Sequence, residues 1–360
     1  MKHERFMIAE GTDEHPRNDS ATTVELPDGT LFMIWMEFMA SEWVSGDEAP
    51  NHLVSKRSAD AGKTWGDFRV EVETAPGDKS VYNSSLLLLP ENELLFFYIR
   101  YNHLVWGDPL EVSGYMKRSK DGGRTWTPPV AMWERDSLCG AHDTLLRLKD
   151  GRLLKPVERM PVWCTPPTGV SSSGCLFSDD NGYTWTESPD WIRLPLRGSM
   201  EAHIAEASDG RLVMAVRNDL GSVFLSSSFD RGESWSKAQS TGLSSPESMP
   251  VIKTIPGSGD LILIWNNSEY DPGFVSHFGK RTPLTAAISR DCGETWECRK
   301  NLIDDPTLQI SNPACVFTSA GTAFITYFTS PMDDPVPPGK WGSNLMSLEA
   351  TIVDIDWLYR

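Results

Sequence analysis

One eight-residue pattern recurs five times along the 360 residues, and it limits the chain to a fold built from repeated units. Each copy has a Ser, an Asp two residues later, a Gly two residues after that, a Thr or Ser, and finally a Trp. The aspartates are Asp60, Asp121, Asp180, Asp230 and Asp291. Their spacings of 61, 59, 50 and 61 residues predict one supersecondary unit for each copy.

The residue types of this pattern suit a tight turn. The Asp side chain accepts hydrogen bonds from the backbone N–H groups that follow it, and the Gly adopts the positive φ that such a turn requires. The hydroxyl ties the turn across, and the Trp supplies a large apolar surface for packing. We therefore expect the five aspartates to be structural and none of them to be a catalytic acid.

A second repeat precedes these turns. It consists of two apolar segments separated by a short turn rich in Asp, Asn and Gly, which is typical of a β-hairpin. The hairpins begin near Thr22, Ser84, Asp143, His203, Met249 and Ala314. Six hairpins, five of them followed by the Asp-containing turn, predict six four-stranded units.

Six units of roughly 60 residues account for the whole chain. They predict a single all-β domain over residues 1–360, a six-bladed β-propeller with four antiparallel strands in each blade. In the last blade, Ala314–Thr318, Ala323–Phe328 and Leu345–Val353 supply three strands. We expect Arg5–Ala9 to supply the fourth and close the ring, because a propeller leaves no long sheet edge unpaired.

The charge balance and the cysteines exclude several partners. The chain has 33 basic and 50 acidic residues, a net charge of −17, which argues against nucleic acid and anionic membranes. No apolar stretch reaches the length of about 18 residues that a transmembrane helix needs. The six cysteines form neither a CxxC pair nor a zinc-like spacing with histidine. We expect no metal or other cofactor.

Residues 1–14 are charged and lack the apolar segment of a signal peptide. Because the cysteines also form no CxxC pair, we expect a cytoplasmic protein whose thiols are reduced. The sequence leaves the oligomeric state open.

The repeated turn, S-x-D-x-G-x-[TS]-W, is the Asp-box, also called the BNR repeat, and with it the whole chain resembles the sialidase superfamily. The resemblance implies the propeller fold more strongly than an activity, because one fold carries many chemistries. Sialidases bind the carboxylate of their sugar with three arginines. They use a Tyr–Glu pair as nucleophile and base, and an Asp as acid.

Four residues match the glutamate and the three arginines of sialidases by their place in the blades. Glu201 precedes an inner strand, and Arg217 ends the strand after it. Arg281 precedes the fifth Asp-box and resembles the third arginine, and Arg17 is the candidate for the first. Three guanidinium groups at one site would bind a carboxylate through paired hydrogen bonds.

The acid and nucleophile positions match less evenly. Asp47 lies in a loop, residues 46–52, like the loop that carries the sialidase acid, with Glu48 as its substitute; burial would have to raise its pKa for that role. The sialidase tyrosine precedes the inner strand of the last blade, where this chain has Asn312. Because Asn does not form the glycosyl–enzyme bond, we expect common sialosides to be poor substrates.

Other ionisable residues lie at the same ends of the predicted hairpins in blades two and three. They are Tyr82, Arg100, Tyr101, His142, Glu158 and Arg159. Arginines that neutralise a carboxylate, with His or Tyr as base, are what β-elimination of a uronic acid requires. His142 with Asp143 is an alternative site for a divalent cation, although an isolated His-Asp pair is weak evidence.

These observations predict a carbohydrate-active enzyme, an exo-acting glycoside hydrolase for an anionic sugar, with Asn312 among its substrate-binding residues. One alternative is a polysaccharide lyase that acts on a uronic-acid glycan, and another is a glycan-binding propeller without activity. Several ionisable groups at one mouth favour an enzyme. The sequence leaves the sugar and its linkage open.

Overall fold

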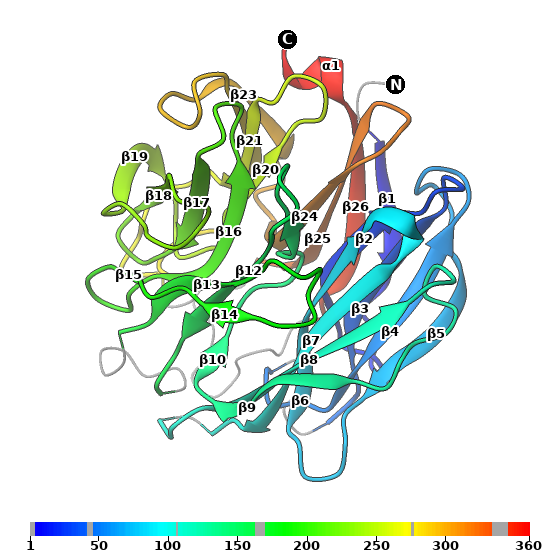
Figure 1. Ribbon diagram of the computed structural model, residues 1–360. Coiled ribbons are helices and arrows are strands. Elements are labelled where there is room, and N and C mark those ends of the chain that lie inside the picture. The colour runs from blue at the N-terminus through cyan, green and yellow to red at the C-terminus, as the bar shows by residue number, and fades with distance from the viewer. Residues whose placement is uncertain (1–3, 42–45, 106, 163–169, 275–276, 333–344) are drawn as a thin grey trace.

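Six sheets form a ring around one axis (Figure 1). The computed structural model describes residues 4–41, 46–105, 107–162, 170–274, 277–332 and 345–360. Neighbouring strands within each sheet are antiparallel, and successive sheets contact one another around the ring. This arrangement confirms the all-β, six-bladed propeller.

In blades one, two, four and five the strands run in chain order from the axis outward. Blade one has β2 (Arg17–Glu25), β3 (Leu31–Phe38), β4 (Asn51–Ser58) and β5 (Gly66–Glu73). Blade two has β6 (Ser80–Leu88), β7 (Leu94–His103), β8 (Glu111–Ser119) and β9 (Val130–Asp136), with the short 3-10 helix η1 (Pro90–Asn92) between β6 and β7. Blade three has β10 (Leu138–Cys139), β11 (Leu146–Arg147), β12 (Leu153–Arg159), β13 (Ser172–Ser178), β14 (Thr186–Glu187) and β15 (Ile192–Arg193).

The second half of the ring repeats this order. Blade four has β16 (Met200–Glu206), β17 (Leu212–Arg217), β18 (Ser222–Ser228) and β19 (Gln239–Ser244). Blade five has β20 (Val251–Thr254), β21 (Leu261–Asn266), β22 (Leu284–Ser289) and β23 (Glu297–Ile303). Blade six has β24 (Leu308–Phe317), β25 (Thr322–Pro331) and β26 (Ser347–Asp354), and the chain ends with α1 (Ile355–Leu358).

The first strand of the chain completes the last blade. Strand β1 (Glu4–Ala9) pairs with β26 in antiparallel register and is the outermost strand of that sheet. An ion pair between Arg5 and Glu349 joins the two strands, and Ile8 is buried. The expected closure by the N-terminal strand is confirmed.

The five Asp-box turns share one hydrogen-bond pattern. In each, the Ser hydroxyl accepts the Gly N–H at 2.8–2.9 Å, and the Asp carboxylate accepts the N–H of the Thr or Ser at 2.8–2.9 Å. The glycines have φ between +81° and +95°, which glycine adopts without strain. The turns connect the third and fourth strands, so antiparallel pairing places them at the end of the blades opposite Arg17 and Glu201.

The inner strands of blades one, two, four and six contain a bulge that the sequence pattern does not show. Ser20, Asn83, Glu201 and Asn312 have φ between +41° and +54°, and the pairing with the second strand shifts at each of them. The strands therefore begin earlier than the hairpin starts expected from apolar alternation, which resumes only after the bulge. Such bulges redirect side chains and are frequent next to active sites.

The apolar core lies between the faces of neighbouring sheets. One cluster joins blades one and two through residues such as Phe32 and Phe96, and another joins blades five and six through Ile264 and Ile325. Five cysteines of the described chain are free, and Cys164 lies outside the described residues. Within the described chain, no helix is long and apolar enough to cross a membrane.

Candidate active site at the mouth of the ring

Antiparallel pairing brings most of the predicted residues to one end of the ring, which we call the mouth. The inner strands begin there, the second strands end there, and the third strands begin there. Arg17 opens β2, Arg217 ends β17, and Arg281 immediately precedes β22. Local strand direction therefore decides which side chains can meet.

Arg17 is a buried member of this group. Its Nη2 donates to Asp19 Oδ2 at 2.6 Å, and its Nη1 donates to Asp47 Oδ1 at 2.6 Å. The guanidinium carbon lies 4.4 Å from the centre of the Phe38 ring, a cation–π distance. Arg17 therefore faces the mouth although it comes early in the hairpin.

Arg217 joins two carboxylates from different blades. Its Nη1 donates to Glu201 Oε2 at 2.7 Å, and its Nη2 donates to Glu247 Oε1 at 2.8 Å. Arg197 also donates to Glu247, which is 1% exposed. Burial opposes ionisation of Glu247, but Arg217 and Arg197 outweigh it and lower the pKa of this carboxyl.

Arg281 completes the set of three predicted arginines. Its Nη2 donates to the backbone carbonyl of Glu247 at 2.9 Å, and its Nη1 donates to Ser311 Oγ at 3.3 Å. Burial, followed by the positive charge of Arg217, lowers the pKa of Arg281 to about 9. Arg217, at the end of β17, and Arg281, before β22, thus approach the same residue, Glu247.

A second carboxyl lies against Glu201. Glu158 is buried at the end of β12, and its Oε2 accepts the backbone N–H of Glu201 at 2.5 Å. Its Oε1 accepts the Cys139 thiol at 3.2 Å. Burial and the negative charge of Glu201 raise the pKa of Glu158 to about 7. A buried carboxyl whose pKa is raised to about 7 is suited to acid–base catalysis near neutral pH.

Tyr82 and Tyr101 also lie at the mouth. Tyr82 Oη donates to Asp47 Oδ1 at 2.5 Å, and the rings of Tyr82 and Tyr101 are 5.1 Å apart. Burial opposes ionisation of Asp47, but the charge of Arg17 and the hydrogen bond from Tyr82 lower its pKa. The raised pKa that an acid role for Asp47 requires is therefore absent.

Asn312 occupies the bulge of blade six, at the position equivalent to Glu201 in blade four. Its amide donates to both oxygens of Asp19, at 3.0 and 3.1 Å. Asp19 in turn accepts from Arg17. Asn312 thus orients the group around the first arginine and offers no nucleophilic atom.

His142 is buried beneath the mouth. Burial lowers its pKa, and its Nε2 has no hydrogen-bond partner among the described residues. Its neighbour Asp143 forms an ion pair with Lys253 at 2.9 Å and accepts from Thr22 at 3.0 Å. Within the described chain, no group of three or more His, Cys, Asp or Glu is arranged to hold a metal ion.

Two of the predicted arginines do not join the cluster. Arg100 donates to Asp78 at 2.9 Å, and its guanidinium lies over the Tyr98 ring. Arg159 pairs with Asp136 and Glu187. Their substrate-binding role stays a prediction, and these contacts do not favour it.

Three residues of the cluster were not among the residues that the sequence singled out. They are Asp19, Arg197 and Glu247. Glu247 stands at the mouth end of its blade, so blade position was a usable signal for it, as it was for Glu158. Nothing in the sequence shows that Arg197 reaches a glutamate 50 residues further along.

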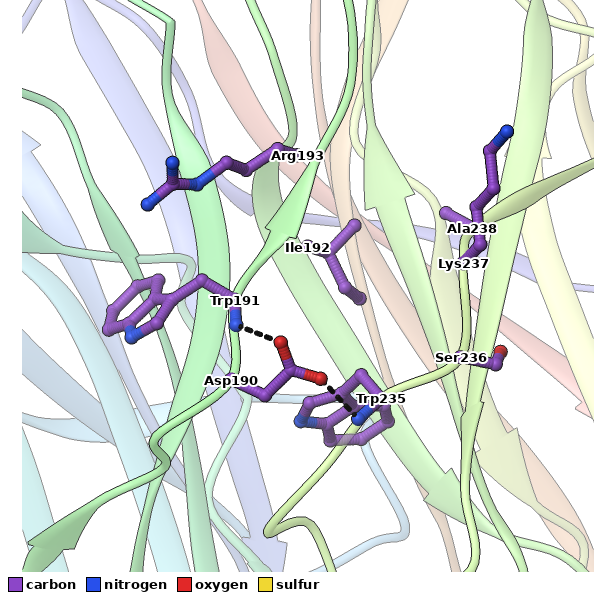
Figure 2. Close-up of a pocket in the computed structure, with 8 residues that line it drawn as sticks. All are labelled: Asp190, Trp191, Ile192, Arg193, Trp235, Ser236, Lys237 and Ala238. Carbon is purple, nitrogen blue, oxygen red and sulfur yellow. Dashed lines mark hydrogen bonds between the residues drawn. The ribbon is translucent and has the colours of Figure 1, made fainter.

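A groove drawn in Figure 2 lies away from the mouth. It has a volume of about 260 Å³ and is lined by residues 190–193 of blade three and 235–238 of blade four. Asp190 accepts the N–H groups of Trp191 and Trp235 at 3.0 and 2.9 Å, as the dashed lines show. These contacts brace two neighbouring blades and include none of the clustered charges.

Known proteins resemble this one in sequence and in fold. The chain is 24% identical over 282 residues to a sialidase from Micromonospora viridifaciens, which covers 70% of this chain and 41% of that protein. It therefore spans less than half of that relative's length. A protein of unknown function from Dyadobacter fermentans has a TM-score of 0.76 at 19% identity, with 99% of both chains covered. The Hadza microbial sialidase Hz136 has a TM-score of 0.76 at 18% identity, covering 98% of this chain and 68% of that one.

The structural likenesses establish the fold, and the sequence matches establish the family. The BNR repeat-like domain matches residues 57–325, which is most of the chain and includes all of the Asp-boxes. The chain therefore belongs to the BNR repeat-like family of the sialidase superfamily.

Proposed function

We propose that the protein is an exo-acting glycoside hydrolase that removes a carboxylate-bearing sugar from the end of a glycan. Membership of the family and the sialidase relatives support carbohydrate as the substrate class. The converging arginines support a charged sugar, and the Glu158–Glu201 pair supports acid–base chemistry. Because Asn312 replaces the sialidase tyrosine, an anionic sugar other than a common sialoside is the proposed substrate.

The surroundings of Arg281 carry the argument for an acidic substrate. Among the described residues its hydrogen-bond partners are the carbonyl of Glu247 and the hydroxyl of Ser311, which are uncharged. Its pKa of about 9 reflects burial and repulsion from Arg217, which the charges of Glu247, Glu201 and Asp19 offset only in part. A carboxylate bound here would relieve that repulsion, whereas a neutral sugar would not.

The test is hydrolysis of a matched set of fluorogenic glycosides by the purified protein. The set contains sialic acid, glucuronic acid, galacturonic acid and neutral galactose on one leaving group. We expect release from a uronic acid and little from sialic acid or galactose. Efficient release of galactose alone would overturn the acidic substrate, and efficient release of sialic acid would overturn the preference against sialosides.

Arg281→Met tests the anion site separately. The change removes a buried cation without leaving a buried carboxylate unpaired, because Arg281 hydrogen-bonds to neutral oxygens. Affinity for the acidic sugar should fall by about 2–4 kcal/mol, the usual loss for truncating a buried charged contact. Arg118→Met, on the Asp-box side of blade two, is the control and should bind like the wild type. Equal affinity in both variants would remove Arg281 from the site.

His142 favours β-elimination as a second candidate function. Its lowered pKa keeps the imidazole neutral near pH 7, and its Nε2 is without a hydrogen-bond partner among the described residues, as a base requires. Elimination from a uronic-acid glycan would leave a conjugated double bond, seen as a rise in ultraviolet absorbance. If the product lacks this absorbance and contains the elements of water added across the glycosidic bond, the reaction is hydrolysis and not elimination.

A further inference from the structure

Hydrolysis with a covalent intermediate needs a nucleophile that Asn312 does not supply. Its amide nitrogen donates to both oxygens of Asp19, and its side chain carries no group that a base could activate. The replacement must lie at the mouth, beside a base, with its ring or chain held in place. The described mouth contains a phenol in that situation.

Tyr82 Oη donates to Asp47 Oδ1 at 2.5 Å, a short, charge-assisted hydrogen bond. Its ring is held edge-on between Phe38, 5.9 Å away, and Tyr101, 5.1 Å away. The Asp47 side chain is 36% exposed, so this carboxylate faces the open mouth. Tyr82 is thus buried and fixed in orientation, with its hydroxyl on a carboxylate that reaches the mouth.

We propose that Tyr82 is the nucleophile of the reaction and that Asp47 is its base. Tyr82 belongs to blade two and Asp47 to blade one, whereas the sialidase tyrosine and glutamate positions lie in blades six and four. Asp47 then acts as a base, which is the opposite of the acid role expected from the sequence. The inference rests on the proposed glycosidase function. Arg17, 2.6 Å from the same Asp47 oxygen, neutralises the carboxylate and fixes it beside the phenol.

The other proton donor lies across Tyr101 from this pair. Tyr101 packs on Tyr82 and is close enough to Glu158 for that carboxyl to help burial raise the pKa of Tyr101. Asp47 has a lowered pKa and is ionised near pH 7, while the pKa of Glu158 is about 7. The mouth therefore holds an ionised base and a protonated acid at the same pH, as two-step glycoside hydrolysis requires.

The proposed steps balance in protons and bonds. Tyr82 Oη bonds to the anomeric carbon as its proton passes to Asp47, and the glycosidic C–O bond breaks while the Glu158–Glu201 pair protonates the leaving oxygen. Water then attacks the anomeric carbon and gives a proton to the same pair. The Tyr82 oxygen leaves and recovers its proton from Asp47. Two displacements retain the configuration of the sugar.

Covalent labelling locates the nucleophile. The probe is a glucuronyl fluoride with a second fluorine beside the anomeric carbon, because the glycosyl–enzyme that it forms hydrolyses slowly. Trypsin separates residues 80–100 from 101–117, and fragmentation of the first peptide distinguishes Tyr82 from Tyr98. We expect the adduct on Tyr82. An adduct on Tyr101, or on a carboxylate, overturns the proposal.

Paired variants distinguish chemistry from packing. Tyr82→Phe keeps both ring contacts and removes the hydroxyl, so we expect a folded protein with wild-type affinity for the sugar acid and with kcat lowered on the order of a hundredfold or more. Tyr115→Phe, stacked on Tyr98 in the same blade, is the control and should keep wild-type kcat. Wild-type kcat in Tyr82→Phe overturns the proposal.

The stereochemistry of the product separates this inference from the proposed function. A retained configuration, observed by NMR before mutarotation, is the expected result. Inversion with efficient hydrolysis leaves the glycosidase function standing and overturns Tyr82 as nucleophile. No hydrolysis of any acidic glycoside by the wild type overturns both.

Discussion

The two ends of the ring hold their carboxylates in opposite ways. At the Asp-box end, Asp60 and Asp180 receive their hydrogen bonds from the same turn, within four residues of sequence. At the mouth, Arg17 and Asp19 are also close in sequence, but other partners come from different blades or from the two ends of the chain, as with Asn312 and Asp19. The first arrangement is a local motif, whereas the second exists only when the ring is closed.

The difference appears in the ionisation of the two groups. Hydrogen bonds from Thr64 and Thr184 lower the pKa values of the exposed Asp60 and Asp180 to about 2. Burial and the nearby Glu201 raise the pKa of Glu158 to about 7. Local donors thus favour the charged form, while burial beside a like charge disfavours it. The buried carboxyl at the mouth therefore lowers stability at neutral pH, whereas the aspartates of the Asp-box end raise it.

The largest expected effect is at the mouth, in Glu247→Ala. The change leaves the guanidinium groups of Arg197 and Arg217 short of a buried partner, which costs about 3–5 kcal/mol in unfolding free energy. Urea unfolding measures it. Glu111→Ala, which breaks an exposed pair with Arg135, is the control and should cost about 1 kcal/mol or less. An equal loss of unfolding free energy in both variants would mean that ion pairs at the mouth contribute no more to stability than exposed surface pairs.

The next effect is a pH dependence that Glu158 imposes. Its pKa is raised by folding from 4.5 to about 7, so its stabilisation is fully present below pH 4.5 and is lost as the pH rises through about 7. Glu158→Gln should lack this loss, on the order of 2 kcal/mol between these pH values. Unfolding of both proteins between pH 4.5 and 7 gives the difference. Parallel curves would contradict the raised pKa.

At the Asp-box end we expect a smaller effect with the opposite dependence on pH. Asp180→Ala removes the acceptor for two N–H groups and two hydroxyls, at about 1–2 kcal/mol. The folded pKa of Asp180 is lowered from 3.8 to about 2, so its contribution is present above pH 3.8 and disappears as the pH falls through about 2. The stability difference between variant and wild type should therefore shrink over that range. A difference independent of pH would show that the carboxylate charge is not responsible.

The smallest effect should come from Thr184→Val. The substitution keeps the shape of the side chain and removes one exposed hydroxyl donor to Asp180, for about 0.5 kcal/mol. Thermal unfolding of this variant and of Asp180→Ala, measured side by side, shows how much of the turn's stabilisation comes from this single hydrogen bond. A cost equal to that of Asp180→Ala would mean that the turn depends on this one bond.

The fold could be predicted because its signals are local. Each Asp-box is complete within eight residues. Residues Arg5–Ala9 form a strand, and the last blade is the one that lacked a fourth strand for it to complete. The starts of the inner strands were misplaced because Ser20, Asn83 and Glu201 interrupt the apolar alternation with positive φ. A bulge is set by pairing with the neighbouring strand, which a single segment does not reveal.

By itself the sequence determined the number of blades, the position of the Asp-boxes and the strands whose ends carry charge. Hydrogen bonds within a turn and alternation along a strand need no distant partner, so they are written in neighbouring residues. Only the tertiary structure decided that Asp47 meets Arg17 and Tyr82 and that Glu158 lies against Glu201. It also pairs Arg100 and Arg159 with carboxylates outside the cluster. Those outcomes depend on burial and on charges from several blades, and both arise only when the ring closes.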